Sequence, residues 1–252
     1  MKSPLAYIGG KSRLAKQIIS QIPDHRTYVE AFSGAAWVFF SKEESKIEVI
    51  NDLDSDLVTF YRCVQNHLEE FLRQFRWLLS SRQIFEEWKE QISQQGLTDI
   101  QRAARYYYLQ RLCFGGRVKN RSFGISNNRR PKLNLLRIEQ EMSDVHLRLC
   151  GVHIENLPAE ELIKRYDHKD TFFYCDPPYY KKPFYKHNMK KEDYIRHADR
   201  LAGIEGKFLY SINDHPVIRE IFKDFKIEPV TLLYTVGTNK AKKGKELLIS
   251  NY

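Results

Sequence analysis

Thr171–Tyr180 reads Thr-Phe-Phe-Tyr-Cys-Asp-Pro-Pro-Tyr-Tyr. The stretch begins with aromatic and β-favouring residues, a pattern typical of a short buried strand, and then reaches two prolines that cannot donate to a sheet ladder. Asp176 is therefore expected at the carboxyl end of a strand. In open α/β sheets this edge is where ligands bind. The sequence thus predicts a carboxylate at a ligand-binding edge.

The residues after this strand suit a planar amine. Asp176 supplies a carboxylate, and Pro177 and Pro178 hold an extended turn that directs backbone carbonyls outward. Tyr179 adds an aromatic face. Two acceptors can take the N–H bonds of an amino group while the ring stacks on the heterocycle, which predicts a site for a nucleobase amino group. The alternative is a rigid turn after a core strand, since the same residue types are common in turns.

Composition bounds the class of protein. A chain of 252 residues can hold one α/β domain with an insertion, and 42% hydrophobic with 29% charged residues indicates a soluble globular protein. Forty-one Lys and Arg against 32 Asp and Glu leave a net charge of +9. With 15 Tyr, 15 Phe and 3 Trp, this balance favours a polyanionic partner.

The four cysteines are widely separated and form no C-x-x-C pair, so we expect reduced thiols, without a disulfide framework or a metal site. The N-terminus lacks an apolar signal core, and nowhere do 18 apolar residues run together. We therefore expect no membrane association and a cytoplasmic location.

A glycine turn near the N-terminus precedes residues with helical spacing from 12 to 22. Gly9 and Gly10 allow the backbone to pass close to a ligand, where unpaired N–H groups and Lys11 favour negative charge. The spacing lacks the P-loop pattern, so a nucleoside triphosphate is not expected. A simple entry from loop to helix remains the alternative.

Arg26–Phe40 reads as a short strand, a small-residue turn and an apolar helix. Glu30 and the turn Phe32-Ser33-Gly34 fall where a doubly wound fold has its first βα loop. The next strand, Ile47–Ile50, runs into Asn51-Asp52, and Asp52 follows Gly34 by 18 positions. Such folds place an acid on ribose hydroxyls at about 20 residues from the turn. Similar turns also occur in α/β proteins that bind no nucleoside.

Residues 55–150 have long helical patterns, no clear strand and many arginines, which predicts a helical insertion between two halves of a sheet. The expected helices are Leu57–Val64, Leu68–Leu79, Ile84–Ile92, Ile100–Leu112 and Leu133–Leu149. Residues 1–54 and 151–252 then form the sheet domain, whose later strands and helices alternate.

Two basic stretches are candidates for nucleic-acid contact. Phe114–Gly124, continuing to Arg129-Arg130-Pro131-Lys132, combines glycines, phenylalanines and arginines, as a loop entering a groove requires. Lys181–Lys191 carries five lysines beside Phe184 and Tyr185. Solvated basic loops are the alternative in both cases. The candidate contacts are Phe114, Arg117, Lys119, Arg121, Arg130, Lys182 and Lys186.

The ordered motifs resemble the Dam-type N6-adenine DNA methyltransferases (D12 class, alpha group). The matching segments are Tyr7-Ile8-Gly9-Gly10-Lys11, Val29-Glu30-Ala31-Phe32-Ser33-Gly34, Asn51-Asp52, Gln101–Arg105, Asp176-Pro177-Pro178-Tyr179, Ser211-Ile212-Asn213-Asp214 and Glu246–Tyr252. Asp-Pro-Pro-Tyr alone is shared with some RNA methyltransferases. The whole set spans nearly the entire chain in the family's order and is highly specific.

The resemblance implies a Rossmann-like, S-adenosylmethionine-dependent catalytic domain (1–54 and 151–252) with an inserted target-recognition domain (55–150). It implies transfer of a methyl group to N6 of an adenine flipped from duplex DNA. Asp176 and the Pro177 carbonyl would accept hydrogen bonds from N6, and Tyr179 would stack on the base. The implied cofactor residues are Tyr7, Gly10, Lys11 (near the cofactor carboxylate), Phe32, Ser33, Gly34, Asp52 (on the ribose hydroxyls), Asn156, Leu157 and Asp176. Asn156-Leu157 matches the family's adenine contact poorly in residue type.

Departures from the family pattern bear on specificity. Ala36 replaces a usual glycine of the Phe-x-Gly-x-Gly turn, and Ala6 stands where GATC-specific relatives often carry lysine. The Phe114–Gly124 loop is shorter than their recognition hairpin, and Gly115 replaces a common Asn. We therefore expect relaxed or altered specificity rather than strict GATC recognition.

Two alternatives stay open, an N6-adenine RNA methyltransferase and a catalytically silent DNA-binding protein of the same fold. The expected partner is double-stranded DNA, with a cognate restriction endonuclease as a further candidate. A monomer associated with the nucleoid of a bacterial or phage-infected cell is expected.

Overall fold

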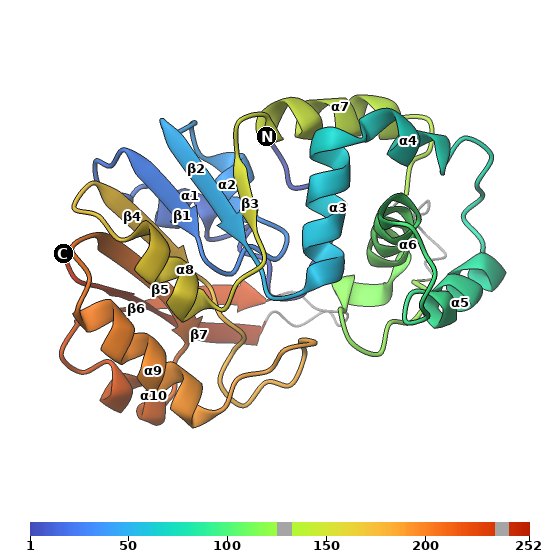
Figure 1. Cartoon of the computed structure of the whole chain (residues 1–252). Coiled ribbons are helices and arrows are strands. Elements are labelled where there is room, and N and C mark those ends of the chain that lie inside the picture. The colour runs from blue at the N-terminus through green and yellow to red at the C-terminus, as the bar shows by residue number, and fades with distance from the viewer. Residues whose placement is uncertain (125–132, 235–241) are drawn as a thin grey trace.

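A seven-stranded sheet forms the centre of the molecule in the computed structural model, which describes residues 1–124, 133–234 and 242–252 (Figure 1). The strand order is β3-β2-β1-β4-β5-β7-β6. The strands from β3 to β5 in this order are parallel, whereas β7 runs antiparallel to both β5 and β6. Their bounds are β1 Thr27–Glu30, β2 Ile47–Asn51, β3 His153–Glu155, β4 Thr171–Cys175, β5 Lys207–Asn213, β6 Lys226–Tyr234 and β7 Lys242–Ser250. The expected Rossmann-like α/β class is confirmed.

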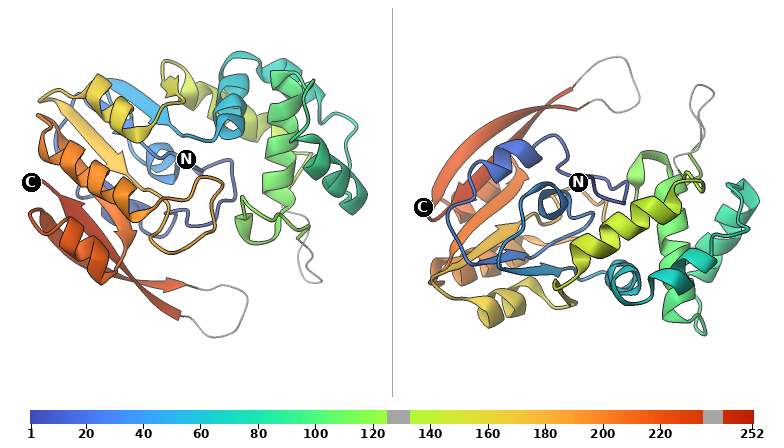
Figure 2. Two further views of the ribbon diagram at one scale, coloured as in Figure 1. Left: turned by 60° about the horizontal axis from the view of Figure 1, so that its bottom comes forward. Right: turned by 90° about the horizontal axis from the view of Figure 1, so that it is seen from above.

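Helices cover both faces of the sheet (Figure 2). One face packs on α1 (Ala15–Ile19) and α2 (Trp37–Ser41), and the other on α8 (Ala159–Tyr166), α9 (Lys191–Ala202) and α10 (Pro216–Ile221). All five residues of β4 are buried. Phe172 and Tyr174 join the core with α1 and α2, whereas Phe173 and Cys175 join the core with α8 and α9. Alternate side chains of a strand face opposite sides, so the apolar run Thr171–Cys175 fills both layers.

The topology places a switch point between β1 and β4. From β1 the chain continues outward to β2, and β4 returns on the other side of β1, with Glu30 opposite Tyr174. The connections therefore leave the carboxyl ends of these two strands in opposite directions, which opens a crevice where ligands bind in such sheets.

The segment between β2 and β3 forms a group of helices beside the sheet (Figure 1). They are α3 (Ser55–Asn66), α4 (Leu68–Arg73), α5 (Arg82–Gln91), α6 (Asp99–Leu112), the 3₁₀ turn η1 (Phe114–Gly116) and α7 (Ile138–Leu149). One continuous hydrophobic cluster joins these helices to the α1–α2 face of the sheet. Within the described residues, none of the helices has the length and apolar character needed to cross a membrane.

Three helices are shorter than their apolar patterns predict. α1 covers Ala15–Ile19 rather than residues 12–22, α4 ends at Arg73 rather than Leu79, and α7 begins at Ile138 rather than Leu133. Residues beyond these bounds continue as tight turns with backbone bonds three residues apart, as from Phe75 to Leu72. Some of their apolar side chains, among them Ile22, Leu78 and Leu133, still pack on the core. Trp77, Leu79 and Leu136 are exposed, so the apolar pattern predicts more buried helix than forms.

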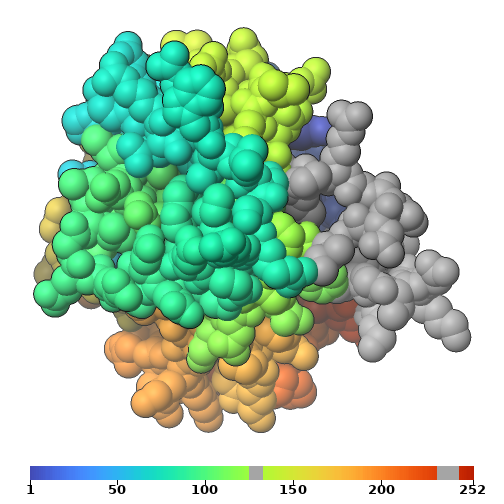
Figure 3. Space-filling model, turned by 90° about the vertical axis from the view of Figure 1, so that its right-hand side faces the viewer, coloured from blue at the N-terminus to red at the C-terminus, as the bar shows by residue number. Residues whose placement is uncertain are grey.

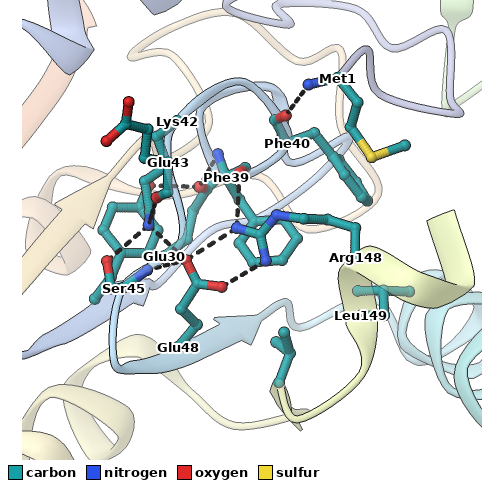
Figure 4. Close-up of polar contacts among 12 residues, drawn as sticks. Met1, Glu30, Phe39, Phe40, Lys42, Glu43, Ser45, Glu48, Arg148 and Leu149 are labelled. Carbon is teal, nitrogen blue, oxygen red and sulfur yellow. Dashed lines mark hydrogen bonds and ion pairs between the residues drawn. The ribbon is translucent and has the colours of Figure 1, made fainter. Parts of the chain in front are cut away.

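A buried ion cluster anchors α7 to the sheet (Figure 4). The Arg148 guanidinium bonds Glu48 Oε1 and Oε2 at 2.9 and 2.5 Å, donates to the Phe39 carbonyl at 3.1 Å, and lies 3.8 Å from the Phe39 ring centroid. Lys42 Nζ is 2.5 Å from Glu48 Oε1. Because all three charged residues are almost fully buried, the insertion is fixed to β2 by paired charges as well as by its core.

Candidate active site

A pocket of about 290 Å³ opens at the switch point. It is lined by segments that are far apart in the sequence: the N-terminal glycine loop, the turn after β1, the residues after β2, the residues after β3, and the segment following β4. Predicted cofactor residues that line it are Tyr7, Gly10, Lys11, Phe32, Ser33, Gly34, Asp52, Leu157 and Asp176. Pro178 of the catalytic motif also lines it, whereas Asn156, Pro177 and Tyr179 are not among its lining residues.

The turn after β1 is held directly by the acid after β2. The Gly34 amide donates to Asp52 Oδ2 at 2.9 Å, and the Asp54 amide donates to Oδ1 at 2.9 Å. Gly34 has φ +46°, and a Cβ there would lie 3.2 Å from Cε1 of the Tyr7 ring. Burial raises the pKa of Asp52 to about 6, although these backbone bonds oppose the rise. The two motifs predicted from their spacing therefore meet in one hydrogen bond.

Ala36 is accommodated in place of the expected glycine by a left-handed backbone. Its φ is +50° and its side chain is 1% exposed. An L-residue in this region costs roughly 1–2 kcal/mol, and Ala has the smallest side chain that must bear it. The substitution therefore leaves the turn formed.

Asn51 was assigned no role from the sequence, yet it joins three segments of the site. Its Nδ2 donates to the carbonyls of Ala31 and Leu157 at 2.9 and 3.1 Å, and its Oδ1 accepts from the Leu157 amide at 2.8 Å. This places Leu157 in the pocket wall. Asn156 instead donates to the Asp52 carbonyl at 2.7 Å and supports the loop from outside.

Lys11 is directed at the catalytic motif. Its Nζ lies 2.6 Å from Asp176 Oδ1, 2.8 Å from the Tyr179 hydroxyl and 3.6 Å from Glu246 Oε2. The Tyr179 hydroxyl in turn donates to Glu246 Oε1. The Asp176 Oδ1 atom also accepts from Ser211 Oγ at 3.0 Å. A closed polar network therefore surrounds the side chain expected to receive the target amine.

Burial and charge act against each other in this network. Burial lowers the pKa of Lys11, but the negative charges of Asp176 and Glu246 raise it by more. The pKa of Lys11 therefore lies above its ordinary value. Burial raises the pKa of Asp176 to about 6, and the bond from Lys11 only partly offsets it. The difference follows from the count of charges: Lys11 faces two carboxylates, whereas Asp176 shares one ammonium with Glu246. Lys11 stays charged, and Asp176 titrates closer to neutrality.

The two prolines form the turn after β4, but the Pro178 carbonyl is bonded within the protein and is not directed outward as the sequence predicts. Pro177 is buried, and the Pro178 carbonyl accepts a hydrogen bond from the Tyr194 hydroxyl at 2.7 Å. α9 therefore fixes the turn that carries Asp176 and Tyr179.

The segment after β4 closes over the glycine loop. The Tyr185 hydroxyl donates to the Ile8 carbonyl at 3.5 Å, and a Cβ on Gly9 would lie 2.2 Å from that hydroxyl. Lys186 Nζ pairs with Asp54 and Asp56 at 2.8 and 3.1 Å. Lys186, predicted as a DNA contact, thus has its charge engaged at the start of α3 in this structure. Lys182 is exposed.

The basic loop of the insertion begins next to this segment. Phe114 is 47% exposed, and Arg117 and Lys119 are exposed. In the space-filling view from the insertion side, light green atoms of the insertion lie directly above the orange atoms of the segment that follows β4 (Figure 3). Phe114–Gly124 and Lys181–Lys191 therefore lie on the same side of the molecule. Arg130 falls outside the described residues.

Arg121 differs from its neighbours in being half-buried. Its guanidinium donates to Gln110 Oε1 at 3.2 and 3.3 Å and lies 5.1 Å from the Tyr106 ring centroid. Gln110 Nε2 donates to the carbonyls of Ala6 and Gly116 at 2.6 and 2.9 Å. Arg121 is thus connected through Gln110 to the loop that carries Tyr7. Gln110 is fully buried, and nothing in the polar and aromatic sequence of α6 distinguishes it from the other polar residues of that helix.

The sheet order and the pocket at the switch point define a Rossmann-like α/β protein with a ligand-binding crevice beside Asp176. A family model described as D12 class N6 adenine-specific DNA methyltransferase matches residues 7–236. The chain therefore belongs to the D12 class N6 adenine-specific DNA methyltransferases and is an enzyme that methylates adenine in DNA.

Curated relatives agree with this family. The chain is 28% identical to the Type II methyltransferase M1.LlaDCHI of Lactococcus lactis subsp. cremoris, over 98% of this chain and 94% of the relative. It is 26% identical to the Type II methyltransferase M.MjaIII of Methanocaldococcus jannaschii, covering 100% and 99% of the two chains. It is also 22% identical to the DNA adenine methylase of Escherichia coli, over 97% and 93%.

Glu246 is the main site residue without a predicted role. An acid directly before the apolar run Leu247–Ile249 is unusual for a buried strand. That signal could have identified it.

Proposed function

We propose that this enzyme transfers the methyl group of S-adenosylmethionine to N6 of an adenine flipped out of duplex DNA. The observation that carries the proposal is the position of Asp176, at the end of β4 and in the wall of the switch-point pocket. A carboxylate there can reach both a cofactor inside the pocket and a base entering from outside.

The chemistry of the pocket fits this cofactor. Asp52 offers a carboxylate for ribose hydroxyls, and Phe32 and Leu157 offer apolar surface for an adenine ring. Glu30 lines the pocket, and its Oε2 accepts from the Tyr28 hydroxyl at 2.6 Å and from the Phe39 amide at 3.0 Å. When bound, the cofactor supplies an electrophilic methyl group, so the protein needs chiefly to orient the attacking amine.

Asp176 and its neighbours would orient that amine. Asp176 Oδ1 is held by Lys11 and Ser211, and we assign Oδ2 and the Pro177 carbonyl to the two N–H bonds of the adenine amino group. The Tyr179 ring would stack on the base. Extracting a base costs a few kcal/mol, and stacking returns about 1–3 kcal/mol. Phosphate contacts from the insertion and from the segment after β4 would supply the remainder.

Residues 55–150 would act as the target-recognition domain and the rest of the chain as the catalytic domain. We extend the proposal to a monomer acting on chromosomal or phage DNA in the cytoplasm, with a cognate restriction endonuclease as a candidate partner. The shorter Phe114–Gly124 loop, Gly115 and Ala6 support relaxed or altered specificity.

The experiment is radiolabelled methyl transfer from S-adenosylmethionine to unmethylated duplexes with and without GATC, followed by nucleoside analysis. N6-methyladenine in both duplexes is the expected result. A hundredfold preference for GATC would contradict relaxed specificity. Transfer to RNA but not to DNA would favour the RNA alternative, and cofactor binding without any transfer would favour the silent binding protein.

The pH dependence of methyl transfer follows from the pKa of Asp176. The carboxylate must be ionised to accept an N–H bond, and burial raises its pKa to about 6. We expect kcat/KM to be maximal above this pH and to fall as the pH drops through about 6. The residual activity of Asp176→Asn should lack this acid limb, because the amide does not titrate. If kcat/KM of that variant still fell at low pH, the fall would have to come from the titration of another group, such as Asp52.

Arg117 is an exposed arginine in the described part of the insertion loop, and its substitution tests whether this loop contacts DNA. Arg117→Ala should weaken duplex binding, and the slope of log K against log salt should fall by about 0.9 if one phosphate contact is lost. Fluorescence anisotropy at several salt concentrations measures both quantities. Lys223→Ala, an exposed lysine of the α10 region paired with Glu220, is the control and should leave the slope unaltered. An identical slope for Arg117→Ala would return this loop to ordinary solvated surface.

A further inference from the structure

Glu246, on β7, contacts Lys11, which pairs with Asp176, and also contacts Tyr179 of the catalytic motif. Its Oε1 accepts the hydrogen bond of the Tyr179 hydroxyl, and its Oε2 lies 3.6 Å from Lys11 Nζ. The Glu246 side chain is 1% exposed. A carboxylate buried to this extent is costly unless it is paired, so these contacts explain how the strand tolerates it.

The position of Glu246 in the sheet is rigid. It pairs with Asn213 of β5 on one side and with Val230 of β6 on the other. β5 also carries Ser211, which donates to Asp176. The sheet therefore fixes Glu246 and Ser211 relative to the end of β4, the strand that Asp176 directly follows.

We propose that Glu246 is a positioning residue for methyl transfer, which fixes the Tyr179 ring and the Lys11 ammonium around Asp176. This inference rests on the proposed function. The Tyr179 hydroxyl accepts from Lys11 at 2.8 Å and donates to Glu246, so two bonds of opposite sense restrict the rotation of the ring. A ring restrained before the base arrives presents one face for stacking, and less conformational entropy is lost on binding.

Glu246 also sets the charge around Asp176. The ionisable groups in contact with Glu246 include Lys11 and Tyr179, and Asp176 interacts with it through its charge. Burial is the main cause that raises the pKa of Asp176, and the negative charge of Glu246 raises it further. Removal of this charge should therefore lower the pKa of Asp176 towards its ordinary value. A residue that served only to stabilise the fold would leave that pKa unchanged.

Three variants test the assignment in the full-length chain with duplex DNA. Glu246→Ala should lower kcat by about tenfold to a hundredfold, the scale expected of misplaced reacting groups, with little change in KM for S-adenosylmethionine. Glu246→Gln keeps an acceptor oxygen for Tyr179 and should recover part of kcat, while the acid limb of kcat/KM moves to lower pH. Glu228→Gln, on neighbouring β6 and paired with exposed Lys226, is the control and should match wild type.

A double variant checks whether Glu246 acts through the Tyr179 hydroxyl. In a Tyr179→Phe background the hydroxyl is absent, so Glu246→Ala should lower kcat by a smaller factor than it does in the wild type. Equal factors in both backgrounds would contradict the proposed route.

The outcomes separate this inference from the proposed function. Suppose that the wild type is active, that Glu246→Ala leaves kcat unchanged, and that the acid limb of Glu246→Gln does not shift. These results would overturn the role of Glu246 but not the proposed function. If Glu246→Ala does not fold, the pH profile of Glu246→Gln decides. A wild type without transfer to DNA overturns the proposed function, and the inference with it.

Discussion

Asp176→Ala should lose methyl transfer while it keeps its cofactor. We expect kcat to fall by at least about 10²- to 10³-fold, the scale found when one hydrogen-bonding group of a preorganised site is removed. Affinity for S-adenosylmethionine should stay within about tenfold, because the rest of the pocket wall is contributed by other loops. Single-turnover methyl transfer and calorimetry measure the two quantities.

The network around Asp176 makes this separation possible. Lys11 keeps Tyr179 and Glu246 as neighbours when Asp176 is removed, so the ammonium is not left alone in the protein interior. Asp176→Asn is the matched variant, since its amide preserves the volume but loses the charge. A collapse of cofactor affinity in both variants would mean that Asp176 binds mainly the cofactor and not the target amine.

Arg148→Ala should be among the most destabilising substitutions in the chain. Arg148 and Glu48 are 8% and 5% exposed, and removal of one partner from a buried ion pair costs about 3–5 kcal/mol. The loss should appear as a lower midpoint of urea unfolding, with catalytic constants of the remaining folded enzyme little changed, because the cluster lies outside the pocket wall.

Arg165→Ala is the control for this prediction. Arg165 pairs with Glu161 four residues away on α8, and both side chains are about half exposed. Such pairs contribute about 0.3–0.5 kcal/mol. Equal destabilisation by the two substitutions would show that the cluster in Figure 4 does not fasten the insertion to the sheet.

The strand at Thr171–Cys175 and the turn after it were predictable because local rules determine them. A run of residues buried on both faces can only be a central strand or a buried helix, and the following prolines exclude continuation of either. The approximate positions of the helices were also predictable, since apolar spacing reports the buried face. Their ends were not, because α1, α4 and α7 pass into tight turns in which some apolar side chains remain buried.

The residues of the cofactor turn could be predicted in part. Gly34 and Asp52 were paired from their spacing, and the structure joins them by a hydrogen bond. The bridging role of Asn51 was not foreseen, because it depends on where the chain returns at Leu157, after the whole insertion. The engagement of Lys186 by Asp54 and Asp56 was missed for the same reason.

The sequence by itself determined the ordered motifs, the α/β class and the position of Asp176 at the carboxyl end of a strand. Each of these depends on residue types that are near one another in the chain. Only the tertiary structure decided that Lys11 and Glu246 meet at Asp176, since Lys11 and Asp176 are 165 positions apart. Their contact requires the sheet order to bring β4, β5 and β7 beside the N-terminal loop. Contacts of this kind depend on how the strands pack, so they cannot be predicted from local sequence patterns.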